Sequence, residues 1–237
     1  RLEDMVPDLA ERTGAYLVGG LSSSRSLFPQ VAGRPAEDGV SGALFTGAVG
    51  VVTGLSQGCV PLGPPRQVTK AHGHTVMEID GRRALDVLQA DVMPVLAGSP
   101  GAMAGGLFIG LPIPGSDTGD YLVRDIVGAD ETTGAIQVRA LVDPGAALLF
   151  CRRDRDSAAA DMDRMLTTLS RRMKGPPQGG IYVGCLARGR HLFGREGAEL
   201  AMIRERLGDF PLTGFFAAGE IANARFYTHT GVLTLFT

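Results

Sequence analysis

The sequence predicts an α/β (α+β) fold of two related lobes, each a mixed or antiparallel sheet flanked by helices. Its 237 residues suffice for one large domain or two ordinary ones. Strand-like apolar runs alternate with amphipathic helices along the chain. Residues 13–21 also resemble residues 213–221, with a shared Thr-Gly opening, a matching aromatic position and a second glycine. Together these features favour two lobes of common design.

Each copy of this internal likeness lies between an amphipathic helix and an apolar strand. The strands are predicted at 41–46 and 230–237, and the helices from apolar residues spaced three to four apart. The first stripe consists of Leu2, Met5, Val6 and Leu9, and the second of Leu200, Ile203 and Leu207. The second copy has a long run of chain before its helix and the first has none. We therefore expect the sequence to be a fragment of a longer protein.

The middle of the chain begins with a predicted hairpin. Residues 68–79 form two strand-like runs that turn at Gly73. A second turn follows, and then a helix that carries Leu85 and Leu88. We expect this helix to end near Pro94, because proline lacks the N–H that continues a helix.

Glycine and proline are frequent in residues 98–116, which we expect to connect the two lobes, with one short strand at 107–109. Residues 121–127 and 135–142 alternate polar and apolar side chains, so they should pair as antiparallel strands. Residues 146–150 are predicted to form a third strand.

The clearest predicted helix follows that third strand. Ser157 is placed to cap it, and residues 175–177, Gly-Pro-Pro, end it. Its acidic residues come early and its basic residues late, which complements the helix dipole. We expect its apolar side to pack in a core rather than to bind a cofactor. That side consists of Met162, Met165, Leu166, Leu169 and Met173.

Composition excludes several classes of partner. The net charge is −2, whereas nucleic-acid binders concentrate lysine and arginine, so nucleic acid is not an expected partner. Three cysteines give neither an even disulfide framework nor a metal motif, which favours a reducing compartment such as the cytoplasm. Two uncharged runs, 39–65 and 92–116, contain too many glycines and prolines for membrane spans. They are expected to be buried strands and turns.

Polar residues interrupt the apolar pattern at predicted strand ends in the last third. Cys185, Arg188 and Glu220 lie there, where a scaffold often presents side chains to a ligand. Arg188 offers donors that suit a carboxylate and Glu220 can accept an ammonium, so together they match the charges of an amino acid. An internal Arg188–Glu220 salt bridge is the structural alternative. Gly189 and Gly219 permit close approach to a ligand or serve tight turns.

Cys185 has two interpretations. The charge of Arg188 would favour its thiolate, whereas a buried cysteine acts as a small hydrophobe. An enzyme built on Cys185 or Glu220, such as a thiol-dependent transferase, is the alternative to a binding module. The sequence has no Gly-x-Ser-x-Gly, phosphate-cradling loop or metal-ligand cluster. We therefore assign no catalytic residue and no metal ligand, and favour a binding module.

Several motifs resemble the FIST domain, in both its N-terminal and C-terminal parts. The most specific is Cys185-x-x-Arg188-Gly189, followed at the right distance by Gly-Phe-x-x-x-Gly-Glu, which ends at Glu220. Other matching segments are Ser41–Phe45, Ser56–Cys59, Val68–Thr69, Glu78–Gly81, Tyr121–Arg124 and Gly179–Gly180. On this resemblance, residues 1–97 are a partial FIST N-terminal lobe, and residues 98–237 are the connector and the FIST C-terminal lobe.

The resemblance implies an intracellular sensory module that binds small ligands such as amino acids. Family members occur beside or fused to signalling proteins, so the expected partner is a signalling protein in trans, such as a histidine kinase or a cyclic-dinucleotide enzyme. A cytoplasmic location is expected, with neither membrane nor nucleic acid as a partner.

Some bacterial relatives are similar to haem-binding nitric oxide sensors, so haem is the alternative to a module without a cofactor. His229 would be the axial ligand, because one neutral imidazole suffices. His72 and His74 flank the predicted hairpin turn, where an exposed turn is favoured over metal chelation. His191 is expected near the rim of the predicted ligand pocket formed by Cys185, Arg188 and Glu220.

Overall fold

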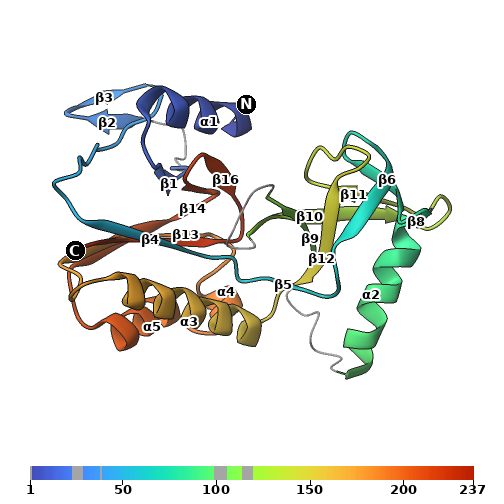
Figure 1. Ribbon diagram of the computed structural model, residues 1–237. Helices are drawn as coiled ribbons and strands as arrows, with labels where there is room; N and C mark the ends of the chain where they lie inside the picture. The colour runs from blue at the N-terminus through green and yellow to red at the C-terminus, as the bar shows by residue number, and fades with distance from the viewer. Residues whose placement is uncertain (1, 23–28, 38, 99–105, 114–119) are drawn as a thin grey trace. The chain divides into compact units, whose positions relative to one another are not determined.

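The computed structural model divides the chain into two compact units, and the mixed α/β class is confirmed (Figure 1). Unit 1 consists of Arg1–Ser56 and Met162–Thr237, and unit 2 of Gln57–Asp161. The residues that the structure describes are 2–22, 29–37, 39–98, 106–113 and 120–237. These units are defined by contacts within the chain. The predicted division into FIST lobes at residues 1–97 and 98–237 is a different one, and it stays a prediction from the family resemblance.

A four-stranded mixed sheet forms the centre of unit 1, in the order β14-β13-β17-β4. β13 and β14 are parallel, whereas the β13–β17 and β17–β4 pairs are antiparallel. The bounds are β4 (Val51–Ser56), β13 (Gly179–Cys185), β14 (Leu212–Ala217) and β17 (Gly231–Phe236). The first and last parts of the chain thus share one sheet, because β4 pairs with β17.

Helices cover one face of this sheet in Figure 1, where α3 and α5 lie side by side. They are α3 (Arg155–Arg172), which enters unit 1 at Met162, and α5 (Ala198–Leu207), preceded by the short α4 (Arg190–Phe193). Four residues of the expected apolar side of α3, Met162, Met165, Leu166 and Leu169, are buried here, which confirms its packing role. Met173 follows the last residue of the helix and is half-buried. The buried core between helices and sheet is Met162, Met165, Leu166, Leu169, Tyr182, Ile203, Phe210, Leu233 and Leu235.

Unit 1 also contains α1 and two smaller sheets, which Figure 1 shows on the other side of the central sheet. The antiparallel three-stranded sheet has the order β1-β15-β16. The bounds are α1 (Leu2–Thr13), β1 (Val18–Gly20), β2 (Gln30–Ala32), β3 (Arg34–Ala36), β15 (Glu220–Ala222) and β16 (Arg225–Tyr227). A side chain at Gly20 would meet Val183 and Ala217, so β1 approaches the central sheet closely.

Unit 2 is a closed six-stranded antiparallel barrel, in the cyclic order β6-β7-β11-β10-β9-β12. Pairing of β7 with β11 closes the ring, which leaves no free edge on these strands. The bounds are β5 (Val60–Pro61), β6 (Arg66–His72), β7 (Thr75–Ile79), β8 (Arg82–Arg83), α2 (Ala84–Gly98), β9 (Leu107–Pro112), β10 (Tyr121–Asp130), β11 (Ala135–Val138) and β12 (Ala147–Arg152). The predicted hairpin at Gly73 and the antiparallel β10–β11 pair are confirmed.

Two predictions about helix ends are wrong. α2 continues through Pro94 to Gly98, because buried residues before the proline, among them Val87 and Leu88, pack in the unit 2 core. Proline removes one hydrogen bond, which such packing can offset. The cap of α3 is Asp154 rather than Ser157: the Ser157 N–H donates to Asp154 Oδ1 over 2.9 Å, and its hydroxyl donates to Oδ2 over 2.8 Å.

One predicted strand is absent, and the two copies of the internal likeness differ in their pairing. Residues 41–46 form no strand, and the strand that pairs with β17 is β4, ten residues later. In the first copy of the internal likeness only Val18–Gly20 is a strand, and it pairs antiparallel with β15. In the second copy Leu212–Ala217 is a strand parallel to β13. The two copies are therefore paired differently, although both lie in unit 1.

Candidate functional site

The three sequence-predicted polar residues, Cys185, Arg188 and Glu220, gather in unit 1, at the end of β13, with three that the sequence did not indicate. We call this group the strand-end cluster: Ser56, Cys185, Arg188, Glu199, Glu220 and Thr230. The register brings three strands together here, since Gly231 pairs with both Ser56 of β4 and Gly184 of β13. All six members are at least 94% buried. Charged side chains that are this deeply buried require hydrogen-bond or ion-pair partners. The contacts of each residue therefore determine which of them is left to bind a ligand.

Arg188 is fully engaged inside the protein. Its Nε donates to Glu199 Oε1 over 2.7 Å, and Nη1 and Nη2 donate to the backbone oxygen and hydroxyl of Ser56, each over 3.2 Å. Nη1 also reaches the His229 carbonyl at 3.4 Å, and the guanidinium lies 5.2 Å from the centre of the Phe193 ring. The ion pair of Arg188 is thus with Glu199 and not with Glu220.

Glu199 is the second charged residue of this network. Its Oε1 accepts from the Tyr182 hydroxyl as well as from Arg188, and its Oε2 accepts from the Gly189 N–H over 3.0 Å. Burial, together with the nearby Glu199 charge, raises the pKa of Tyr182, so the phenol stays protonated and donates. The Arg188–Glu199 ion pair therefore has no net charge, and both side chains have hydrogen-bond partners.

Glu220 differs from Glu199, because only one of its oxygens is satisfied. Its Oε2 accepts from the Thr230 N–H over 3.1 Å and from the Thr230 hydroxyl over 2.7 Å. Its Oε1 is buried and has no hydrogen-bond partner among the described residues. Burial raises the pKa of Glu220 to about 7, although Thr230, the charge of Arg188 and the Cys185 thiol act in the opposite direction.

The two predicted glycines have structural roles in this arrangement. Gly189 has φ of 61°, a left-handed conformation that favours glycine, and this backbone presents its N–H to Glu199. A side chain at Gly219 would collide with the ring of Phe226 on β16. Their use in approaching a ligand stays a prediction. Cys185, the last residue of β13, is 6% exposed and lies beside Glu220.

The histidines are dispersed. His229 is half-buried just before β17 and its backbone is left-handed, with φ of 65°. His72 and His74 are exposed on either side of the β6–β7 turn, and His191 is exposed on α4. Among the residues that the structure describes, no group of three or more His, Cys, Asp and Glu side chains is placed to hold a metal ion.

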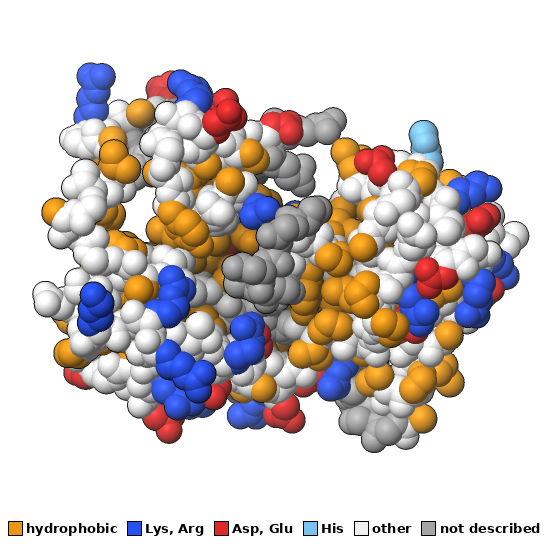
Figure 2. Space-filling model, in the orientation of Figure 1, with side chains coloured by type: hydrophobic (Ala, Val, Ile, Leu, Met, Phe, Trp, Pro, Cys, Tyr) orange, Lys and Arg blue, Asp and Glu red, His pale blue; other side chains and the backbone are white. Residues whose placement is uncertain are grey.

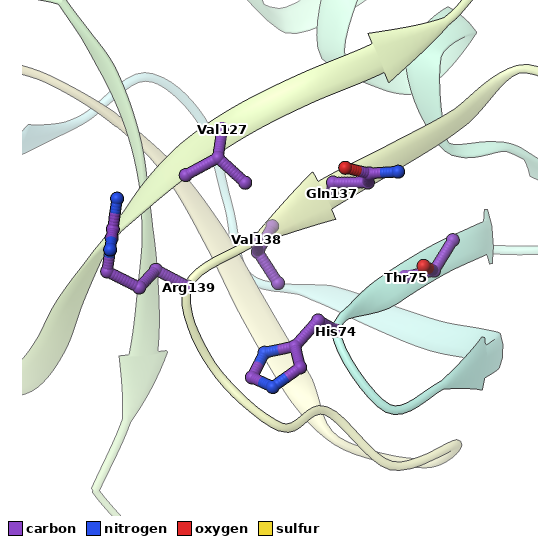
Figure 3. Close-up of a pocket in the computed structure, with 6 residues that line it drawn as sticks. All are labelled: His74, Thr75, Val127, Gln137, Val138 and Arg139. Carbon is purple, nitrogen blue, oxygen red and sulfur yellow. The ribbon is translucent and has the colours of Figure 1, made fainter.

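A pocket of about 460 Å³ lies in unit 2, and none of the predicted site residues lines it (Figure 3). Figure 3 shows side chains from the β6–β7 turn, β7, β10, β11 and the segment after β11 around it. Its lining is His74, Thr75, Val127, Gln137, Val138 and Arg139. Arg139 is ion-paired with Asp125 at 3.3 Å, and Val127 is 52% exposed. The pocket is therefore shallow and lined by both polar and apolar side chains, and it does not bring several charged groups together.

The sequence interpretation missed Glu199, the residue that neutralises Arg188. A signal was present, because Glu199 lies four residues before the buried Ile203 and so shares its helix face. The predicted stripe began instead at Leu200, which is 45% exposed. Ser56 and Thr230 carried no local signal, since their roles depend on strand pairing between distant segments.

Charged side chains outside the cluster form a solvated surface. On the face shown in Figure 2, lysine and arginine side chains gather over the helical layer of unit 1, interspersed with acidic ones. Arg206 pairs with Asp163, and Arg204 with Asp209 at 3.5 Å. Within the described ranges, no helix combines the length and hydrophobicity needed to cross a membrane.

Comparison with known proteins identifies two family models along the chain. The FIST N domain matches residues 1–82, and the FIST C domain matches residues 84–223. An uncharacterized protein of Mycobacterium tuberculosis is 40% identical over 193 residues, which are 75% of this chain and 49% of that protein. An uncharacterized protein of Mycobacterium bovis is 38% identical over 191 residues, 77% of this chain and 48% of that protein. The chain spans about half the length of these curated relatives.

Proposed function

This chain belongs to the FIST family, and from that membership we propose that it is a small-ligand-binding sensory module of a signal-transduction system. FIST domains are generally considered small-ligand sensory domains of signalling proteins. The observation that carries the proposal for this chain is Glu220, a fully buried carboxylate with one oxygen that lacks a hydrogen-bond partner among the described residues. Buried polar atoms in folded proteins are nearly always paired, so an unpaired one calls for a partner, and a ligand atom is the partner that we propose.

The proposed role is recognition rather than catalysis. Two charged groups of the strand-end cluster, Arg188 and Glu199, are engaged with each other and with backbone atoms, an arrangement that orders a site. We place the module in the cytoplasm, with its output through a signalling protein in trans, such as a histidine kinase or a cyclic-dinucleotide enzyme. The family membership supports this context.

The test is a ligand screen on the purified chain. Thermal shift would be recorded over amino acids, amines, carboxylates and neutral metabolites, because a ligand that binds the folded state raises the melting temperature. An absorbance spectrum taken first separates the haem alternative, since bound haem gives a Soret band. Selective, saturable stabilisation by one ligand class supports the proposal. A screen without any stabilising ligand, together with a spectrum without a Soret band, would refute it.

A further inference from the structure

The strand-end cluster contains one carboxylate more than it contains cations. Arg188 and Glu199 neutralise each other at 2.7 Å, and both are almost fully buried. Glu220 takes part in no ion pair among the described residues. A buried carboxylate without a counter-charge is costly, so it takes up a proton or binds a cation. Thr230 supplies two neutral donors to Oε2, and the Cys185 thiol is a weak neutral donor beside the carboxyl. No hydrogen bond of good geometry reaches Oε1 from the described residues, and none of these donors carries a positive charge.

We propose that Glu220 Oε1 is the receptor for the ammonium group of a primary amine, which enters the cluster in exchange for a proton. This inference rests on the proposed sensory function and specifies its ligand class. An ammonium group supplies both the missing positive charge and an N–H donor, and a charge-assisted hydrogen bond of this kind is stronger than a neutral one. Glu220 is fully buried, so association requires local opening of the structure around it.

The same geometry argues against recognition of an amino acid through both of its charges. That scheme needs a free guanidinium for the ligand carboxylate. The donors of Arg188 already reach Glu199, Ser56 and the His229 carbonyl. A second carboxylate would have to displace a buried ion pair, which costs several kcal/mol in general. The ligand class is therefore a primary amine, and a carboxylate on the ligand adds nothing at Arg188.

Groups that titrate or carry charge near Glu220 are few. Cys185 lies beside it on β13, and Arg188 acts on it through its charge. Tyr227 is its register partner on β16, and its partner on β1 is a glycine. His229 precedes Thr230 in the segment that leads to β17. Proton exchange on amine binding is expected at Glu220, because its raised pKa of about 7 leaves it half-protonated at neutral pH.

The experiment is calorimetric titration of the whole chain with methylammonium at pH 6, 7 and 8. Tetramethylammonium, which has the charge but no N–H, is the matched control ligand, and acetate and alanine test the carboxylate. We expect methylammonium alone among the cations to bind, with affinity roughly tenfold higher at pH 8 than at pH 6. At pH 7, two buffers of different ionisation enthalpy should reveal release of about half a proton per ligand.

Variants assign the effect to Glu220. Glu220→Gln should abolish methylammonium binding and the proton release, whereas Glu205→Gln, at an exposed position of α5, should change neither. Thr230→Val removes one donor to Glu220 Oε2 and so raises its pKa further. Binding to this second variant should weaken at pH 7 and recover at pH 9, which keeps the test valid if Glu220→Gln does not fold.

The outcomes separate this inference from the proposed function. Binding of methylammonium that survives Glu220→Gln or releases no proton overturns the inference. So does binding of alanine or acetate, but not methylammonium, and in both cases a small-ligand module remains. If methylammonium fails to bind while the wider screen finds another ligand, only the amine class is refuted. Failure of every ligand and of haem overturns both proposals.

Discussion

The unusual state of Glu220 should be visible in the pH dependence of stability. Burial raises its pKa from 4.5 to about 7 in the folded chain. Between these two values the folded state holds a proton that the unfolded state has lost, so the free energy of unfolding falls as pH rises. The contribution is fully present below pH 4.5 and is lost as pH rises through 7. At about 1.4 kcal/mol per pKa unit, the whole effect is about 3 kcal/mol.

Urea denaturation of the wild type and of Glu220→Gln, followed by circular dichroism, isolates this contribution. All other titrating groups are common to both proteins, so their effects cancel in the difference. Between pH 5.5 and 8 the stability of the wild type relative to the variant should fall by about 2 kcal/mol. Glu205→Gln should run parallel to the wild type across this range. A difference for Glu220→Gln that stays flat within about 0.5 kcal/mol would refute the assignment of a raised pKa to this group.

Three further substitutions test the packing around the cluster and the second unit. Arg188→Met should destabilise the chain by about 3–5 kcal/mol in urea denaturation, since it leaves Glu199 buried without its cation; a loss under 1 kcal/mol would contradict the ion pair. Gly219→Ala should cost about 1–3 kcal/mol through its clash with Phe226, and the double variant with Phe226→Leu should recover part of that loss. Pro94→Ala should stabilise α2 by up to about 3 kcal/mol, measured as a higher midpoint of unfolding, and a lower midpoint would show that the ring itself is needed.

Local patterns in the sequence predicted most of the elements correctly. The apolar side of α3 and the hairpin at Gly73 are determined by neighbouring residues, and the structure contains both. The cap prediction for α3 failed because Asp154 and Ser157 are only three residues apart and both are good capping residues, and the prediction considered only Ser157. The central sheet of unit 1 could not be predicted, because β4 and β17 are separated by about 180 residues and nothing local records their pairing.

The candidate site shows the same limit in its electrostatics. The sequence predicted that Arg188 and Glu220 lie at strand ends, and the structure places both in the strand-end cluster. Which carboxylate neutralises the guanidinium, however, depends on the direction in which α5 presents Glu199. That single contact changes the chemistry of the site: it removes the cation that an amino-acid carboxylate would need and leaves Glu220 without a counter-charge. The proposed amine would bring the missing positive charge, and the proton that Glu220 holds near neutral pH is the occupant it would have to displace.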